Sequence, residues 1–334
     1  MNSKIITLIQ SGQFKQALIE FDLALKKTPH DAQLWSNRGV VLIQLGQLTQ
    51  ARESIYTSLN IQHDDQVEQN LINLLIQLNQ FKEASEHNNR QLKKNNNSAQ
   101  LQLNKAKITA GLNNWDESFE IYSQIINKYP QYLPAYVAYA YELNKQEKYE
   151  EAIAINLKAL KVDSNCYPAI LNLGIAYNNN KEYENALLYL KKYVNVHQPD
   201  MKTWQTIISA QLKTHGWLGA RESIILAQEI DPNNILLKFQ NGALYLIERK
   251  FEQAINELRE VIAMDKDHVE AHYHLALALL AQKQFTNVDH EFRYRIKSEK
   301  IKYGRFDDFI ATGINEKTEL LIGKEQGIGD EILL

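Results

Sequence analysis

The order of apolar and small residues repeats along the chain with a spacing of 34 residues. The clearest copy is Tyr167–Asp200, and we number its positions from Tyr167 as position 1. Small residues stand at positions 8 and 20, here Gly174 and Ala186, and large apolar residues stand at positions 7, 11, 17 and 24. Small side chains let two antiparallel helices approach closely, and the large ones fill the space around that contact. Each copy therefore predicts one helical hairpin.

Position 17 holds an aromatic residue or leucine in nine successive copies. These residues are Phe14, Leu48, Phe81, Trp115, Tyr149, Tyr183, Trp217, Phe251 and Phe285. Every interval is 34 residues except that from Leu48 to Phe81, which is 33. Because these large apolar residues come at the start of the second helix of each hairpin, we expect them in the core. This placement in the core excludes the alternative that the aromatic residues at position 17 form a stacking platform for nucleic acid.

The first copy is short and predicts a helix over Ser3–Gln10 followed by a second over Phe14–Lys27. The third copy departs most from the pattern, because Ile72 replaces the small residue at position 8 while polar Asn88 and Gln91 stand at positions 24 and 27. We expect a local irregularity there. The repeat array is predicted over residues 1–297, and a charged linker over residues 298–318.

The last residues, 319–334, change in character. Glu319–Gly323 has the composition of a short strand, and the glycine-containing turn Lys324–Glu331 follows it. Gly327 and Gly329 would let backbone N–H groups approach an anion, and Asp330 lies beside them. We interpret this segment as the truncated start of an α/β domain.

Composition and charge narrow the function classes. A net charge of −3 without a basic stripe argues against general nucleic-acid binding. The longest apolar run, Leu275–Ala281, is too short to span a bilayer, and the N-terminal residues carry no readable secretory signal. The single cysteine, Cys166, fits a reducing compartment. We therefore predict a cytoplasmic protein that does not insert into membranes.

Polar side chains recur at position 6, which faces the groove in many helical repeat arrays. They are Asn37, Asn70, Asn104, Asn172, Thr206, Gln240 and His274, with Ala138 as the one gap. An amide both donates and accepts, so a row of amides could hydrogen-bond the backbone of an extended peptide. In the alternative interpretation, asparagine is simply abundant in this chain and tolerates a solvated helix face.

Two histidines near the end of the array could be considered as ligands of a metal site. His268 and His272 are four residues apart, but the segment HVEAH lacks the zinc-protease pattern and a third ligand of the usual kind. We predict no metal site there. No nucleophile motif or phosphate-binding loop stands in the sequence, so we predict no catalytic residue and no cofactor.

The columns over residues 3–295 resemble the tetratricopeptide repeat family. That resemblance implies an all-α fold, a right-handed superhelix of antiparallel hairpins whose concave groove binds a protein or peptide. The position-6 asparagines are similar to the ladder that lines the repeats of O-linked N-acetylglucosamine transferases. The predicted function is a non-catalytic scaffold for protein–protein interaction, of undetermined oligomeric state.

The end of the chain resembles bacterial proteins in which such repeats precede a heptosyltransferase-like domain. Glu325, Gln326, Gly327, Gly329 and Asp330 match an EQGxGD turn of that group. In those enzymes the glycine and the aspartate belong to the acceptor side of the active site. The alternative function is therefore the acceptor-recruiting part of a glycosyltransferase, which would be inactive as given because the nucleotide-sugar site is absent.

Overall fold

The computed structural model describes residues 3–297, and within that range the chain consists of helices and the turns between them. The first helices of the hairpins are α1 (Ser3–Gln10), α3 (Ala32–Gln44), α5 (Asp65–Gln77), α7 (Ala99–Gly111), α9 (Leu133–Lys145), α11 (Tyr167–Asn179), α13 (Met201–Lys213), α15 (Ile235–Ile247) and α17 (Val269–Ala281). The second helices are α2 (Phe14–Lys27), α4 (Leu48–Ile61), α6 (Phe81–Lys94), α8 (Trp115–Lys128), α10 (Tyr149–Val162), α12 (Tyr183–Val194), α14 (Trp217–Ile230), α16 (Phe251–Met264) and α18 (Val288–Lys297). The all-α solenoid of helical hairpins predicted from the sequence is confirmed. The linker and the α/β start predicted for residues 298–334 lie outside the described residues.

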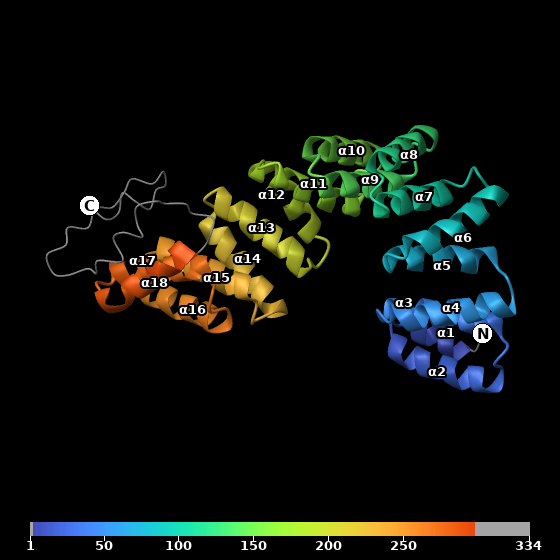
Figure 1. Ribbon diagram of the computed structural model, residues 1–334, viewed down its shortest axis with the longest axis horizontal. Coiled ribbons are helices and arrows are strands. Elements are labelled where there is room, and N and C mark those ends of the chain that lie inside the picture. Colours follow the sequence, from blue (N-terminus) through green and yellow to red (C-terminus); the bar gives the residue numbers. More distant parts are fainter. Residues whose placement is uncertain (1–2, 298–334) are drawn as a thin grey trace. The chain divides into compact units, whose positions relative to one another are not determined.

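The chain divides into two compact units, residues 1–220 and 221–334, and the division falls within α14. In unit 1 the helices follow one another as packed antiparallel pairs, for example α3 with α4 and α11 with α12 (Figure 1). In unit 2, α15 packs against α16 and α17 against α18 in the same way. Each hairpin also packs against the next one along the chain within its unit, so the core of each unit is built from neighbouring repeats.

Small residues at position 8 allow the close helix contact that the sequence predicts. A Cβ atom added to Gly39 would lie 2.6 Å from Ile55 Cγ1, and one added to Gly174 would lie 2.7 Å from Leu190 Cγ. Ile55 and Leu190 both stand at position 24 and are fully buried. The backbone of the first helix therefore packs directly on a large side chain of the second helix.

The turn inside each hairpin contains one residue with a left-handed backbone conformation. It stands at position 15 in all nine copies and is Gly12, Gly46, Asn79, Asn113, Glu147, Lys181, His215, Arg249 or Lys283. Glycine and asparagine adopt this conformation readily, whereas the later residues do so against their own preference. Packing of the two helices therefore imposes the turn.

The expectation that position 17 lies in the core is only partly correct. Trp115 is partly buried and packs against the core of unit 1, but Trp217 is 38% exposed and Phe285 is 66% exposed. Phe285 opens a short 3-10 helix, η1 (Phe285–Asn287), in place of an α-helix. The fully buried positions are instead 20 and 24, exemplified by Ala186 and Leu190.

The third hairpin, α5 with α6, keeps the helix lengths of its neighbours and carries its irregularity in two other places. The link before α5 has only three residues, 62–64, which accounts for the 33-residue interval. Its core contains the polar side chains of Asn88, Gln91 and Glu68, all at least 97% buried. Asn88 Nδ2 donates to the Leu101 carbonyl oxygen at 3.0 Å, so the polar side chain also ties this hairpin to the next one.

Candidate functional site

The first helices of successive hairpins in unit 1 lie side by side, because α5 contacts α7, α7 contacts α9, α9 contacts α11 and α11 contacts α13. Position 6 recurs on the same side of each helix, and position 9 lies one turn further along it. We call the surface formed there the first-helix face. It is defined by Asn70, Tyr141, Asn172 and Thr206.

Two of the position-6 asparagines take part in bonds within the protein. Asn104 is fully buried, and its Oδ1 accepts from Gln100 Nε2 at 2.9 Å, while its Nδ2 has no partner among the described residues. Asn172 Nδ2 donates to the Val137 carbonyl oxygen of the preceding hairpin at 3.1 Å. The Asn172 amide therefore ties α11 to the first helix α9, whereas the Asn104 bond stays within α7.

The remaining position-6 residues differ in their surroundings. Asn37 and Asn70 are half-buried. The Thr206 hydroxyl donates to the Lys202 carbonyl oxygen of its own helix at 2.9 Å. Gln240 and His274 belong to unit 2.

In unit 2 the His274 ring stacks on Phe239 with centroids 5.2 Å apart. His274 Nδ1 and Gln240 Oε1 are buried and have no hydrogen-bond partner among residues 3–297. Burial lowers the pKa of His274, an effect that Glu270 opposes and His268 adds to. The imidazole is therefore held in its neutral form more strongly than a histidine in water.

A group of ionic and aromatic residues on the first-helix face was not identified in the sequence. Lys145 Nζ lies 3.4 Å from Glu142 Oε2, 5.5 Å from the Trp115 ring centroid and 5.8 Å from that of Tyr141. Tyr141 is 49% exposed, whereas the Glu142 side chain is only 13% exposed. A cation over ring faces gains attraction from the π-electrons. The arrangement presents an exposed aromatic ring next to an ion pair in which Glu142 is shielded and Lys145 is half-exposed.

Burial perturbs the charges at this group. Desolvation raises the pKa of Glu142, although Lys145 and Lys107 act in the opposite direction. Desolvation likewise lowers the pKa of Lys107 on the neighbouring helix α7, and Glu142 opposes that shift. Glu142 lies four residues after Ala138 on the same helix, and the gap that Ala138 makes in the asparagine row was the signal that the sequence offered.

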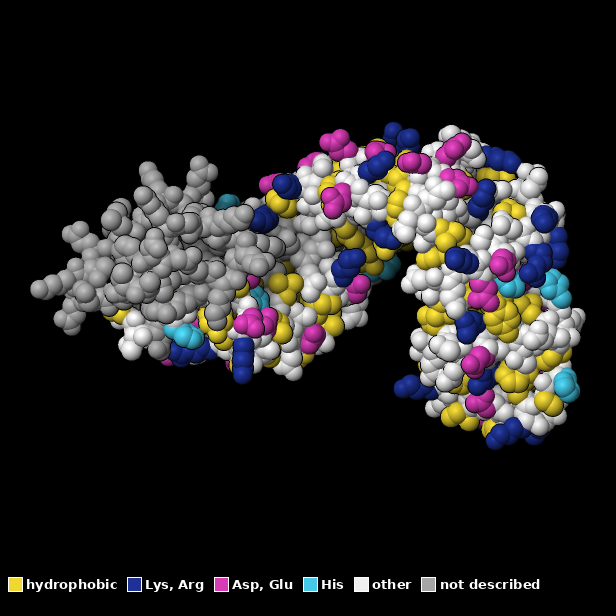
Figure 2. Space-filling model, viewed as in Figure 1, with side chains coloured by type: hydrophobic (Ala, Val, Ile, Leu, Met, Phe, Trp, Pro, Cys, Tyr) yellow, Lys and Arg dark blue, Asp and Glu magenta, His cyan; other side chains and the backbone are white. Residues whose placement is uncertain are grey.

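The charges on the visible face of unit 1 are mixed in sign. Figure 2 shows Lys and Arg side chains interspersed with Asp and Glu side chains over the described residues. This distribution fits the absence of a basic stripe in the sequence.

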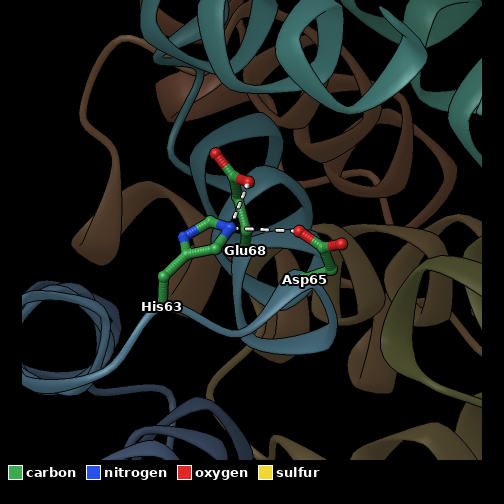
Figure 3. A group of neighbouring side chains, drawn as sticks. All are labelled: His63, Asp65 and Glu68. Carbon is green, nitrogen blue, oxygen red and sulfur yellow. Dashed lines mark hydrogen bonds and ion pairs between the residues drawn. The ribbon is translucent and has the colours of Figure 1, made fainter. Parts of the chain in front are cut away.

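A second cluster lies at the N-terminal end of α5. His63 Nε2 is 3.0 Å from Asp65 Oδ1 and 3.8 Å from Glu68 Oε2, and the three side chains point toward one another (Figure 3). One ligand atom from each lies within 4.8 Å of those of the other two. Glu68 is 1% exposed, whereas His63 and Asp65 are exposed. Asp64 caps α5 by accepting from the Gln66 and Val67 backbone N–H groups.

Side chains of α6 surround this cluster. Lys94 Nζ lies 2.7 Å from Asp65 Oδ1, and Gln91 Nε2 donates to the same oxygen at 2.8 Å. Glu68 Oε1 accepts from His87 Nδ1 at 2.8 Å and pairs with Arg90 Nη1 at 3.3 Å, while Oε2 accepts from Gln91.

The histidines that suggested a metal site in the sequence have structural contacts instead. His268 Nδ1 accepts from the Ala271 backbone N–H and so caps α17. His272 is 2% exposed and contacts Glu291 of α18 and the Lys266 carbonyl oxygen. These bonds fix the N-terminal end of α17 and tie it to α18.

Comparison with protein families decides which kind of repeat this is. Family models described as tetratricopeptide repeat match residues 4–62, 98–132, 133–166 and 245–286. The chain is built from tetratricopeptide repeats. The matched segments lie in both units and follow the hairpins described above.

Individual similar proteins share the repeats over limited lengths. Sperm-associated antigen 1 of Rattus norvegicus is 25% identical over 112 residues, which are 34% of this chain and 11% of that protein. A chain of the APC/C hetero-tetramer Cut9–Hcn1 aligns with a TM-score of 0.52 at 14% identity, over 85% of this chain and 57% of that one. YrrB, described as a TPR protein with an unusual peptide-binding site, aligns with a TM-score of 0.48 at 19% identity, over 57% of this chain and 97% of its own. The chain thus spans about a tenth of the length of the curated relative, and the structural similarity concerns the fold.

The described helices were also compared with the requirements of a membrane span. None of those within residues 3–297 is long and apolar enough to cross a bilayer. The residues of the glycosyltransferase-like turn, Gly327, Gly329 and Asp330, lie outside the described part of the chain.

Proposed function

We propose that the chain is a non-catalytic scaffold that binds a partner protein, as an extended peptide, on the first-helix face of unit 1. The observation that carries this proposal is the group on α8 and α9 in which Tyr141 is 49% exposed beside Lys145 and Glu142. Exposed aromatic rings next to shielded charges are frequent anchors at protein interfaces.

The position-6 residues would contribute in two ways. Asn172 ties α11 to the neighbouring first helix α9, which would keep the face rigid before a ligand arrives. Asn70, which is half-buried, would offer its amide group to a peptide backbone. Each such hydrogen bond contributes about 0.5–1.5 kcal/mol, so affinity must come from several repeats and from the aromatic anchor together.

The test begins with a random 12-residue peptide library displayed on phage and selected against the purified chain. The affinity of a selected synthetic peptide is then measured by fluorescence anisotropy for wild type, Tyr141→Ala and Leu188→Ala. Leu188 is a matched control, because it is 65% exposed but lies on the second helix α12. We expect Tyr141→Ala to weaken binding about tenfold or more and Leu188→Ala to leave it unchanged. Equal affinity in all three proteins, each folded by circular dichroism, would refute the assignment of this face.

A second candidate is the recruitment of an acceptor protein to a glycosyltransferase. It rests on the EQGIGD segment, whose Gly327, Gly329 and Asp330 resemble an acceptor-side turn. On this reading the 334-residue chain binds the acceptor but transfers no sugar from nucleotide-sugar donors. Detecting transfer by this chain in a radiolabel assay would contradict its proposed role as a non-catalytic part.

A further inference from the structure

The cluster of His63, Asp65 and Glu68 has the chemistry and the spacing of a metal site. We propose that it binds a divalent transition-metal ion, with zinc as the best match. Zinc takes one imidazole nitrogen and carboxylate oxygens at about 2.0–2.2 Å, so neighbouring ligand atoms of a tetrahedral site lie roughly 3.3 Å apart. The distances of 3.0 Å from His63 Nε2 to Asp65 Oδ1 and 3.8 Å from His63 Nε2 to Glu68 Oε2 bracket this value. An imidazole among the ligands favours zinc over magnesium or calcium.

The position of Lys94 supports a preference for a cation at this point. Its ammonium nitrogen lies 2.7 Å from Asp65 Oδ1 and 3.4 Å from His63 Nε2, so it contacts two of the three ligand groups. Lys94 is the last residue of α6, and its side chain is 48% exposed, which leaves it room to turn into solvent. A divalent ion would replace this single charge with two charges closer to both carboxylates. Lys94 therefore acts as a competitor of the metal.

The residues around Glu68 hold its carboxylate in a suitable orientation. Its Oε1 faces His87 Nδ1 and Arg90 Nη1, so that Oε2 is turned toward His63. Gln91 Nε2 donates to Glu68 Oε2 and to Asp65 Oδ1. Lys94 Nζ also donates to Asp65 Oδ1, so that oxygen has a lone pair for a metal once the ion displaces Lys94. Such outer contacts orient the ligands of natural metal sites. Three protein ligands leave one tetrahedral position for water.

The third copy differs from its neighbours in the residues that form this cluster. The link between α2 and α3, one repeat earlier, also carries a histidine followed by a helix-capping aspartate, His30 and Asp31. The residues that correspond to Asp65 and Glu68 there are Ala32 and Trp35. The first hairpin junction thus provides one histidine without the carboxylate ligands, which makes it a control within the same chain.

The experiment measures zinc binding to the untagged full chain by competition with a fluorescent zinc chelator. We expect one ion per chain, and an affinity that falls about tenfold or more in His63→Ala and in Asp65→Asn but not in His30→Ala. Removing the competing ammonium in Lys94→Gln should raise the affinity. Zinc should also raise the melting temperature of wild type and not that of His63→Ala.

Several outcomes would overturn the proposal. One is equal affinity of wild type and His63→Ala, which would mark an adventitious ion bound elsewhere. Another is the absence of any wild-type binding at micromolar zinc. A lower affinity in Lys94→Gln would contradict the assignment of Lys94 as competitor. His63 and Asp65 are exposed, so their substitution should leave the helices intact, and circular dichroism verifies this in each variant.

Discussion

The contact between Gly174 and Leu190 allows a test of the packing rule that organises every hairpin. The perturbation is Gly174→Ala, measured alone and together with Leu190→Ala. The added Cβ would lie 2.7 Å from Leu190 Cγ and 2.8 Å from Leu190 Cδ2, closer than real Cβ atoms come. Leu190 is fully buried, so it has no free space into which to move.

Two effects of opposite sign determine the result. Alanine in place of a glycine inside a helix stabilises by about 1 kcal/mol. Overpacking of a filled core destabilises by about 1–3 kcal/mol. We therefore expect Gly174→Ala to destabilise the wild-type chain by about 1 kcal/mol. Leu190→Ala alone should cost about 2–5 kcal/mol, because it leaves a cavity.

The combined variant should reverse the sign of the glycine substitution. Once Leu190 is alanine the clash is gone, and Gly174→Ala should stabilise by about 1 kcal/mol. The double-mutant cycle would then give a coupling of about 2 kcal/mol, within the range of residues in contact. Urea unfolding followed by circular dichroism at 222 nm measures all four proteins. The reasoning is wrong if Gly174→Ala has the same sign and size in both backgrounds.

Three further predictions concern other features. Gly46→Ala should destabilise by about 1–2 kcal/mol in thermal unfolding, because Gly46 has a φ of 73° and no neighbour that an added Cβ would touch, so backbone strain is the only cost. Trp115→Ala should lower the free energy of unfolding in urea by about 3 kcal/mol. Phe285→Ala should lower it by less than about 0.5 kcal/mol, because the Phe285 side chain is 66% exposed. Equal losses of stability in the two variants would contradict the difference in burial. Burial lowers the pKa of His274 in the folded chain below its ordinary value of 6.5, so on acidification the unfolded chain binds this proton at a higher pH than the folded chain does. The free energy of unfolding is therefore unaffected by His274 above about pH 6.5 and decreases below that pH. Stability curves of His274→Phe should lack that decline, and a curve identical to wild type between pH 7 and 5 would refute the assignment.

The helix starts could be predicted from the sequence because they follow from the 34-residue period. Phe14, Trp115 and Phe251, for example, each begin a second helix as expected. The left-handed turn residues were not predictable in the same way. Lys181 and Arg249 adopt that conformation because the two flanking helices fix the turn, and their own side chains give no signal for it.

The candidate site was less accessible from sequence because its contacts join different copies of the repeat. Asn172 was expected to face a ligand, yet its amide donates to the Val137 carbonyl oxygen, which only the packing of α9 against α11 brings close. Trp115 and Lys145 are 30 residues apart, and only the packing of α8 against α9 brings the indole ring to the ammonium group. The 34-residue period aligns equivalent positions of successive repeats, but it does not indicate which non-equivalent positions of two neighbouring repeats come into contact.

In the third hairpin, the residues that depart from the repeat pattern are connected to the proposed metal ligands. Its Ile72 is fully buried at position 8, where most copies have a small residue, and the polar Asn88 replaces a large apolar residue at position 24. Burying polar groups costs free energy unless each finds a partner. The Leu101 carbonyl oxygen accepts from Asn88 Nδ2 and the two carboxylates accept from Gln91, whereas Asn88 Oδ1 has no partner among the described residues. Gln91 donates to both Asp65 and Glu68, so this buried polar residue fixes the exposed carboxylate of Asp65 and the buried carboxylate of Glu68. Departure from the repeat pattern in the core and assembly of the metal cluster are thus parts of one change.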